Sequence, residues 1–143
     1  MDTPYHFFHR TPIQIRFNDV DIMGHVNNSV YQNYFDYARL RYFEEVFGYR
    51  IDWFDKALVL VKIEIEYQQP VRMFDEIGVL TKVFHLGNKS LQMEQLLVGT
   101  DQQDVRCSNR AVLSAFSYQE GKAVELPERW RKAVAQYEHD LSF

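Results

Sequence analysis

The spacing of hydrophobic and polar residues changes several times along the chain, and each change marks a predicted element. Apolar and polar residues alternate from Ile13 to Phe17, which predicts a short strand with one buried face. From Ser29 to about Phe47 there is no glycine or proline, and apolar residues cover most of the helical circumference. We therefore predict a helix that is buried rather than laid on a surface, and that ends at Gly48.

The second half of the chain has the two-residue period of strands. The four predicted runs are Val59 to Tyr67, Asp75 to Phe84, Ser90 to Val98 and Val105 to Tyr118. Long strands linked by hairpins favour an antiparallel sheet that wraps one face around the helix, so the predicted fold class is α+β. A last helix begins at Pro127, and its apolar stripe consists of Trp130, Ala133, Val134, Tyr137 and Leu141.

Composition limits the class of protein. A length of 143 residues predicts a single domain over 1–143, and 46% hydrophobic and 25% charged residues are ordinary for a globular protein. The net charge of −4 argues against broad nucleic-acid binding, which needs a basic face. We expect no nucleic-acid partner.

The single cysteine and the apolar runs bear on location. Cys107 excludes an intrachain disulfide, fits a reducing compartment and is expected to be a buried thiol. Met1 to Pro12 lacks the apolar stretch of a signal peptide. The longest aliphatic run, Ala57 to Val61, is far too short to span a membrane. A cytoplasmic protein without a membrane span is expected.

Residues 19–31 concentrate the polar chemistry. They read Asp-Val-Asp-Ile-Met-Gly-His-Val-Asn-Asn-Ser-Val-Tyr and stand just before the long helix. Asn27 or Asn28 can cap that helix, whose first turn exposes unpaired N–H groups. Asp21 is close enough for its carboxylate to fold back toward these amides. A nucleophile or base beside preformed amide donors is the minimum equipment for acyl transfer.

Two other interpretations of this segment are open. Asp19 and Asp21 could begin a calcium loop, but such a loop needs an oxygen ligand at its fifth position and a glutamate at its twelfth. Met23 and Val30 occupy those positions. The two carboxylates could also be turn and cap residues without a catalytic role. On a strand they would point the same way, and one would be redundant.

The segment resembles the signature of the 4-hydroxybenzoyl-CoA thioesterase family of hotdog folds. The pattern is Asp19-x-Asp21-x-x-Gly24, a tyrosine ten residues after the second aspartate (Tyr31), and a late Ala38-Arg39 on the helix. The resemblance implies an antiparallel sheet wrapped around a long buried central helix, plus a C-terminal helix. It also implies an acyl-CoA thioesterase that forms a homodimer or homotetramer. Coenzyme A then belongs to the substrate, and neither a metal nor another cofactor is expected.

The resemblance also assigns roles to individual residues. Asp21 becomes the reactive carboxylate, as a nucleophile or as a general base for water, while Asp19 is structural. The main-chain N–H of Asn28 would polarise the thioester carbonyl, and Asn27 would fix the turn. Tyr31 either lines the acyl pocket or is plain core.

His25 is weighed separately because the chain departs from its relatives nearby. Some family members have a tyrosine four residues before the reactive aspartate and a histidine seven residues after it, where this chain has Phe17 and Asn28. A tyrosine–histidine relay is therefore in doubt, and His25 becomes the candidate for catalysis or substrate contact. His6 and His9 are expected to lie on a solvated N-terminal arm, since no further ligand stands at metal spacing.

Lys89 and Ser90 match positions that contact coenzyme A in the family, in a predicted hairpin between two long strands. Gly87 and Asn88 stand where some relatives have arginines, so a loose phosphate grip is expected. Lys89 could equally be an ordinary turn lysine.

Two further functions compete with acyl-CoA hydrolysis. An acyl carrier protein thioesterase on the same fold would need a broad basic rim for its acidic partner, which the sequence does not display clearly. A non-catalytic acyl-binding hotdog module would not need the complete Asp21 motif. A panel of acyl-CoA thioesters assayed for thiol release, with the wild type and Asp21→Asn, is the most useful experiment.

Overall fold

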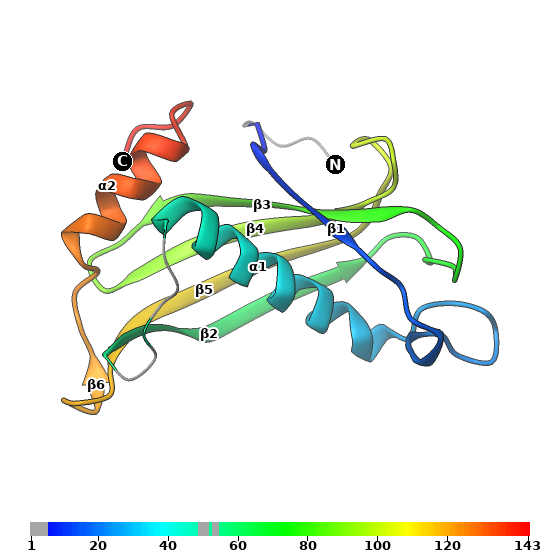
Figure 1. The fold of residues 1–143 in the computed structure, drawn as a ribbon, viewed down its shortest axis with the longest axis horizontal. Coiled ribbons are helices and arrows are strands. Elements are labelled where there is room, and N and C mark those ends of the chain that lie inside the picture. The colour runs from blue at the N-terminus through cyan, green and yellow to red at the C-terminus, as the bar shows by residue number, and fades with distance from the viewer. Residues whose placement is uncertain (1–5, 49–51, 53–54) are drawn as a thin grey trace.

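One antiparallel sheet and two helices make up the fold in the computed structural model, which describes residues 6–48, 52 and 55–143. The long helix α1 lies across one face of the curved sheet, and α2 lies near its C-terminal end (Figure 1). This is the predicted α+β hotdog architecture. The strands are β1 (His9–Ile13), β2 (Lys56–Tyr67), β3 (Ile77–Leu86), β4 (Ser90–Val98), β5 (Val105–Ser117) and β6 (Lys122–Ala123). The helices are α1 (Tyr31–Phe47), α2 (Glu128–Tyr137) and two short 3₁₀ turns, η1 (Phe17–Asp19) and η2 (Asn28–Val30).

The order of strands differs from simple hairpin succession. The sheet runs β1-β3-β4-β5-β2, with β6 paired to β5. Only β3, β4 and β5 follow one another as predicted, and β2 pairs with β5 at one end of the sheet. After β2 ends, the next two residues stay beside β5, because the N–H groups of Gln68 and Gln69 both donate to the Arg106 carbonyl. It then crosses to β3 instead of turning back.

The first strand lies earlier than the alternation of Ile13 to Phe17 predicts. β1 pairs with β3 from His9 opposite Thr81 to Ile13 opposite Ile77. Phe17 belongs to η1 instead, and 82% of its surface is exposed. The alternation failed there because the chain leaves the sheet after Ile13 to form the loop that precedes α1.

Helix α1 begins and ends close to its predicted limits. Gly48 adopts a left-handed φ of 71° and its N–H donates to the Glu44 carbonyl, so it closes the helix as expected. The sheet covers only one side of the helix. The buried side includes Tyr34, Phe35, Ala38 and Tyr42. Burial over most of the helical circumference is not found in the single chain, because Asp36, Tyr37, Leu40 and Arg41 are exposed.

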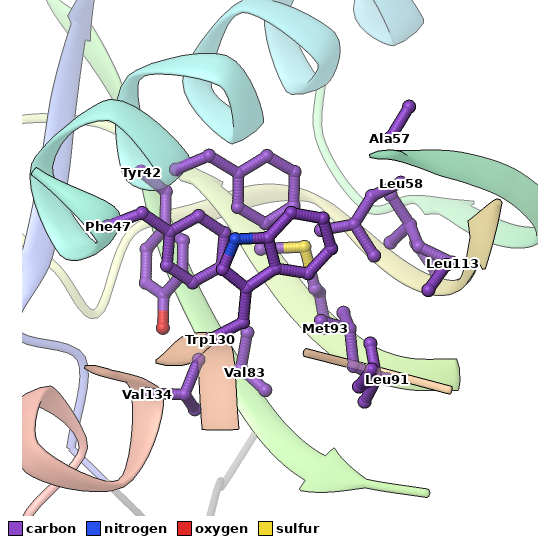
Figure 2. Packing of buried hydrophobic residues seen from close by; sticks show 14 residues of the cluster. Tyr42, Phe47, Ala57, Leu58, Val83, Leu91, Met93, Leu113, Trp130 and Val134 are labelled. Carbon is purple, nitrogen blue, oxygen red and sulfur yellow. The ribbon is translucent and has the colours of Figure 1, made fainter. Parts of the chain in front are cut away.

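The largest core cluster joins the C-terminal half of α1 to α2 and the sheet. Figure 2 shows the Trp130 ring against Phe47. The two ring centroids are 5.3 Å apart, and the ring planes lie 12° from parallel. Val134 is fully buried in the same cluster, to which the sheet contributes Val83 of β3 and Met93 of β4. Burying one large apolar side chain contributes about 1.5–3 kcal/mol. This packing fixes α2 against the end of the sheet.

A buried ionic network lies at the same end of the molecule. Lys82 and Glu138 are fully buried, and the Lys82 Nζ lies 2.9 Å from one Glu138 oxygen and 2.8 Å from an Asp140 oxygen. The other Glu138 oxygen accepts hydrogen bonds from the Tyr42 hydroxyl at 2.7 Å and the Val83 N–H at 3.2 Å. The end of α2, the sheet and α1 are thus joined through charges that all have partners.

Two predictions about single residues have opposite outcomes. Cys107 is buried as expected, and burial raises the pKa of its thiol to about 12. His9 does not lie on a solvated arm: it is 5% exposed, and its Nε2 lies 2.8 Å from the Glu45 carboxylate. Burial lowers the pKa of His9 despite that carboxylate.

The two edges of the sheet differ. β2 spans 12 residues, and along its length Val59, Val61 and Ile63 are exposed. β1 has five residues and includes Pro12, which has no N–H to donate. Among the described residues, neither helix combines the length and the apolar composition needed to cross a membrane.

Candidate active site

The loop between η1 and α1 is organised around Asp19. Its side chain is buried and accepts hydrogen bonds from the Arg16 N–H at 2.9 Å and the Tyr34 hydroxyl at 2.7 Å. Burial alone would raise the pKa of Asp19, but these hydrogen bonds and the Arg16 charge outweigh burial and lower it. The Asp19 carbonyl also accepts from the Asn27 N–H at 2.9 Å, which closes the loop onto the start of α1.

Asp21 has a different environment from Asp19, so the expectation that both point the same way along a strand is wrong. It is exposed, in a tight turn in which the Gly24 N–H donates to its carbonyl and Gly24 takes a φ of 79°. One carboxylate oxygen accepts from the N–H groups of Met23 at 2.9 Å and His25 at 3.2 Å. The carboxylate therefore binds amides of its own turn rather than those of the helix. Its second oxygen has no hydrogen-bond partner among the described residues.

The main-chain amides at the start of α1 are almost all occupied. The Val26 N–H donates to the Val71 carbonyl, and Val30 donates to the Asn27 carbonyl. Asn27 is the cap, because its side-chain oxygen accepts from the Ser29 N–H at 3.1 Å. The Asn28 N–H is left over: between residues 26 and 30 it alone lacks an acceptor within the described part of the chain.

His25 and Tyr31 lie in the same region but differ in exposure. His25 is half-buried, and its imidazole makes no hydrogen bond to any residue that the structure describes. Tyr31 is 2% exposed, and its ring lies edge-on to those of Tyr34 and Tyr67. In the single chain, Tyr31 is therefore a core residue rather than an exposed pocket wall.

Lys89 and Ser90 lie far from Asp21 along the fold. Lys89 lies in the hairpin that links β3 to β4, and Ser90 begins β4; this hairpin lies toward the C-terminal end of α1, whereas Asp21 precedes its N-terminal end. Lys89 is exposed, and its carbonyl accepts from the Ala115 N–H. Sequence reasoning missed Arg131, whose guanidinium donates to the carbonyls of Gly87 and Asn88 and so holds this hairpin against α2.

Sequence reasoning also missed Tyr67, the last residue of β2. Its hydroxyl donates to the Asn28 carbonyl at 3.2 Å. In the sequence Tyr67 is only the end of an alternating strand, and nothing in that pattern links it to a turn 39 residues earlier.

An apolar pocket opens between α1 and the first half of β2. It has a volume of about 240 Å³ and is lined mostly by Leu40, Phe43, Leu58, Leu60 and Leu113, with Asp36 and Arg39 beside them. In the part of the chain that the structure describes, no group of three or more His, Cys, Asp or Glu side chains could hold a metal ion.

Comparisons with known proteins agree with this architecture. Residues 15–134 match the model of the thioesterase-like superfamily, and the chain belongs to that superfamily. A thioesterase from Thermus thermophilus, whose structure was determined in complex with coenzyme A and Zn, is 31% identical with a TM-score of 0.80, covering 93% of this chain and 96% of that one.

Two other relatives are similar over most of their length. The PA5185 protein of Pseudomonas aeruginosa is 30% identical with a TM-score of 0.83, covering 95% of both chains. The uncharacterized protein YsmA of Bacillus subtilis is 27% identical over 133 residues, which are 92% of this chain and 87% of YsmA.

Proposed function

We propose that the protein is an acyl-CoA thioesterase that releases a free acid and coenzyme A, with Asp21 as the reactive carboxylate. The observation that carries this proposal concerns two groups on one loop, an exposed Asp21 carboxylate oxygen and the Asn28 N–H, which both lack a hydrogen-bond partner among the described residues. The 31% identical thioesterase that binds coenzyme A supports the choice of substrate.

The two groups can divide the chemistry of hydrolysis. As a nucleophile, the Asp21 oxygen attacks the thioester carbon, the C–S bond breaks, and water hydrolyses the resulting anhydride. As a base, Asp21 takes a proton from the water that attacks the same carbon. In both routes negative charge develops on the carbonyl oxygen, where an amide donor such as Asn28 N–H stabilises it by about 2.7–4 kcal/mol. His25 stands beside this chemistry as a substrate contact.

We propose further that two copies pair through β2. Among the described residues this strand pairs with β5 alone, and its exposed valines and isoleucine would be aggregation hazards if left open. The antiparallel pairing of two β2 strands would extend the sheet across both chains. The exposed side of α1 would then face the second copy near the join.

Such a dimer offers an explanation for the distance between Asp21 and Lys89. The Tyr67 end of β2 lies at the start of α1, whereas Val59 pairs with Ser114, which pairs in turn with Ser90. In an antiparallel pair, the Tyr67 end of one copy lies beside the Val59 end of the other. The Lys89 hairpin and the apolar pocket of one protomer would thus approach the Asp21 loop of the other.

A panel of acyl-CoA thioesters tests the chemistry. Acetyl-, hexanoyl-, benzoyl- and palmitoyl-CoA are assayed for thiol release with the wild type and Asp21→Asn. The same acyl groups on acyl carrier protein form a second arm. Faster turnover on the carrier would favour the carrier-protein thioesterase, and no turnover on either would favour an acyl-binding module.

Sedimentation tests the assembly. Val61 lies at an irregularity of β2 where the register shifts, and it is 64% exposed. Val61→Lys should convert an oligomer to monomers at micromolar concentration, because it places a charge at the join. Thr100→Lys adds the same charge in an exposed turn and should leave the oligomer intact. A wild-type monomer would contradict the proposed pairing.

A further inference from the structure

We infer that Tyr67 is a positioning residue of the candidate site, whose hydroxyl holds the Asn28–Ser29 peptide so that the Asn28 N–H stays aimed at the substrate carbonyl. This inference rests on the proposed thioesterase function and adds a residue to it. Tyr67 itself need not touch the substrate.

The geometry shows a peptide group held at both ends. The Asn28 carbonyl accepts the Tyr67 hydroxyl at 3.2 Å, and the Ser29 N–H donates to the Asn27 side-chain oxygen at 3.1 Å. A peptide group is planar, so fixing its oxygen and its N–H fixes the whole plane. The direction of the Asn28 N–H relative to this fixed plane then depends only on the φ and ψ angles of Asn28.

Tyr67 is itself fixed by regular structure. It is the last residue of β2 and pairs in register with Cys107 of β5. Its ring lies edge-on to that of the buried Tyr31, with centroids 5.2 Å apart and planes at 81°. Tyr67 is 48% exposed, so its hydroxyl is positioned by the strand and by this one ring contact, which place a donor before reaction.

The arrangement also explains why the amide is available. The N–H groups of Asn27, Ser29 and Val30 donate to acceptors in the loop, and that of Val26 donates to the Val71 carbonyl, whereas the Asn28 N–H has no acceptor among the described residues. If the Asn28–Ser29 peptide could rotate, the Asn28 dihedrals would change and the Asn28 N–H could turn toward solvent. Tyr67 opposes that rotation from outside the loop.

Tyr67→Phe tests the inference, because it keeps the ring against Tyr31 and removes only the hydroxyl. A net hydrogen bond of about 1 kcal/mol corresponds to a loss of about fivefold in kcat, with KM changed by less than about twofold. An inhibitor pair separates positioning from general destabilisation. A CoA trifluoromethyl ketone that forms a tetrahedral oxyanion should bind about fivefold more weakly, whereas a thioether CoA analogue should bind equally well.

Tyr118→Phe is the matched control. Tyr118 is exposed, its hydroxyl makes no hydrogen bond within the described residues, and its loss should change neither kcat nor the affinity for the ketone. If Tyr67→Phe keeps wild-type kcat and ketone affinity while Asp21→Asn is inactive, the inference is overturned and the proposed function stands.

Amide hydrogen exchange gives a readout that does not need activity. If the wild type hydrolyses no thioester, the proposed function fails, and exchange at Ser29 and Val30 still tests the role of Tyr67. Tyr67→Phe should accelerate exchange at both amides several-fold. Unchanged exchange would overturn the inference.

Discussion

The two ends of α1 use the same kinds of polar group in opposite ways. At the C-terminal end, the fully buried Lys82 and Glu138 satisfy each other together with Tyr42 and Asp140. At the N-terminal end, Asp21 is exposed and half of its carboxylate has no partner among the described residues.

This contrast separates structural from chemical use of charge. A buried charge must have partners, because an unpaired one destabilises the fold strongly. An exposed carboxylate oxygen can lack a protein hydrogen-bond partner at little cost in stability, because water solvates it. Only an oxygen without such a partner is free to act on a substrate. The difference predicts that substitutions near the C-terminal end of α1 alter stability, whereas substitution of Asp21 near the N-terminal end alters turnover.

The largest expected effect is on stability. Lys82→Met leaves the Glu138 charge buried without its cation, and should lower the free energy of unfolding by about 3–5 kcal/mol. Urea denaturation measures this loss. Lys122→Met is the control, since Lys122 and Glu120 form an exposed pair at 4.0 Å, and should change stability by less than about 1 kcal/mol. A similarly small loss for Lys82→Met would break the comparison.

Asp21→Asn should have the reverse profile. The amide keeps the shape and an acceptor oxygen for the turn, but removes the charge needed to attack the carbonyl or deprotonate water. We expect kcat to fall by about 10²-fold or more, with little change in stability. Asp101→Asn is a matched control, because Asp101 also accepts from the N–H two residues on, in an exposed turn. Near-full turnover by Asp21→Asn would remove the catalytic assignment and leave the fold.

Acid should reveal Asp19 as the structural aspartate of the loop. Its folded-state pKa is lowered, so its contribution to stability is present above the unfolded pKa of about 3.9 and is lost as pH falls through the folded pKa. Asp19→Asn should cost about 1.5–3 kcal/mol at pH 7, because it loses charge-assisted hydrogen bonds from Arg16 and Tyr34.

The measurement is thermal unfolding of both proteins from pH 7 to pH 3. The stability difference between wild type and Asp19→Asn should shrink as the pH falls. A difference independent of pH would mean that the charge of Asp19 does not matter.

The smallest expected effect concerns coenzyme A. Lys89→Ala removes one exposed cation from the hairpin, so KM should rise a few-fold at low salt while kcat stays nearly constant. The increase should disappear at high salt, where surface charges are screened. Lys122→Ala, which removes an exposed lysine of β6, should leave KM unchanged. A fall in kcat for Lys89→Ala would place this lysine closer to the reacting atoms than proposed.

The sequence predicted elements better than it predicted their neighbours. Strand β4 and the stop of α1 at Gly48 were predicted correctly because periodicity and glycine act locally. The position of β2 beside β5 was missed, since the choice between a hairpin and a crossing depends on contacts such as those of Gln68 with β5. His9 was missed because the residues it contacts, Glu45 and Tyr42, lie far away in the chain.

The candidate site shows the same division. Residues 19–31 could be singled out because their residue types stand together in the sequence. Which amide remains unpaired could not be predicted, since it depends on partners such as Val71 and Asp19 that the fold brings to the loop. Tyr67 contributes through one hydrogen bond of its hydroxyl, and an alternating strand pattern contains no information about which group that hydroxyl contacts.

The proline in β1 bears on how large an assembly can grow. A sheet with two open edges can add copies without end and become a fibre, whereas one usable edge closes after a single pairing. β1 is short and includes Pro12, which has no N–H to donate, while β2 presents a full strand. Growth through backbone pairing would therefore stop at two chains, and a point change that restored an N–H at position 12 would be the first step toward a polymer.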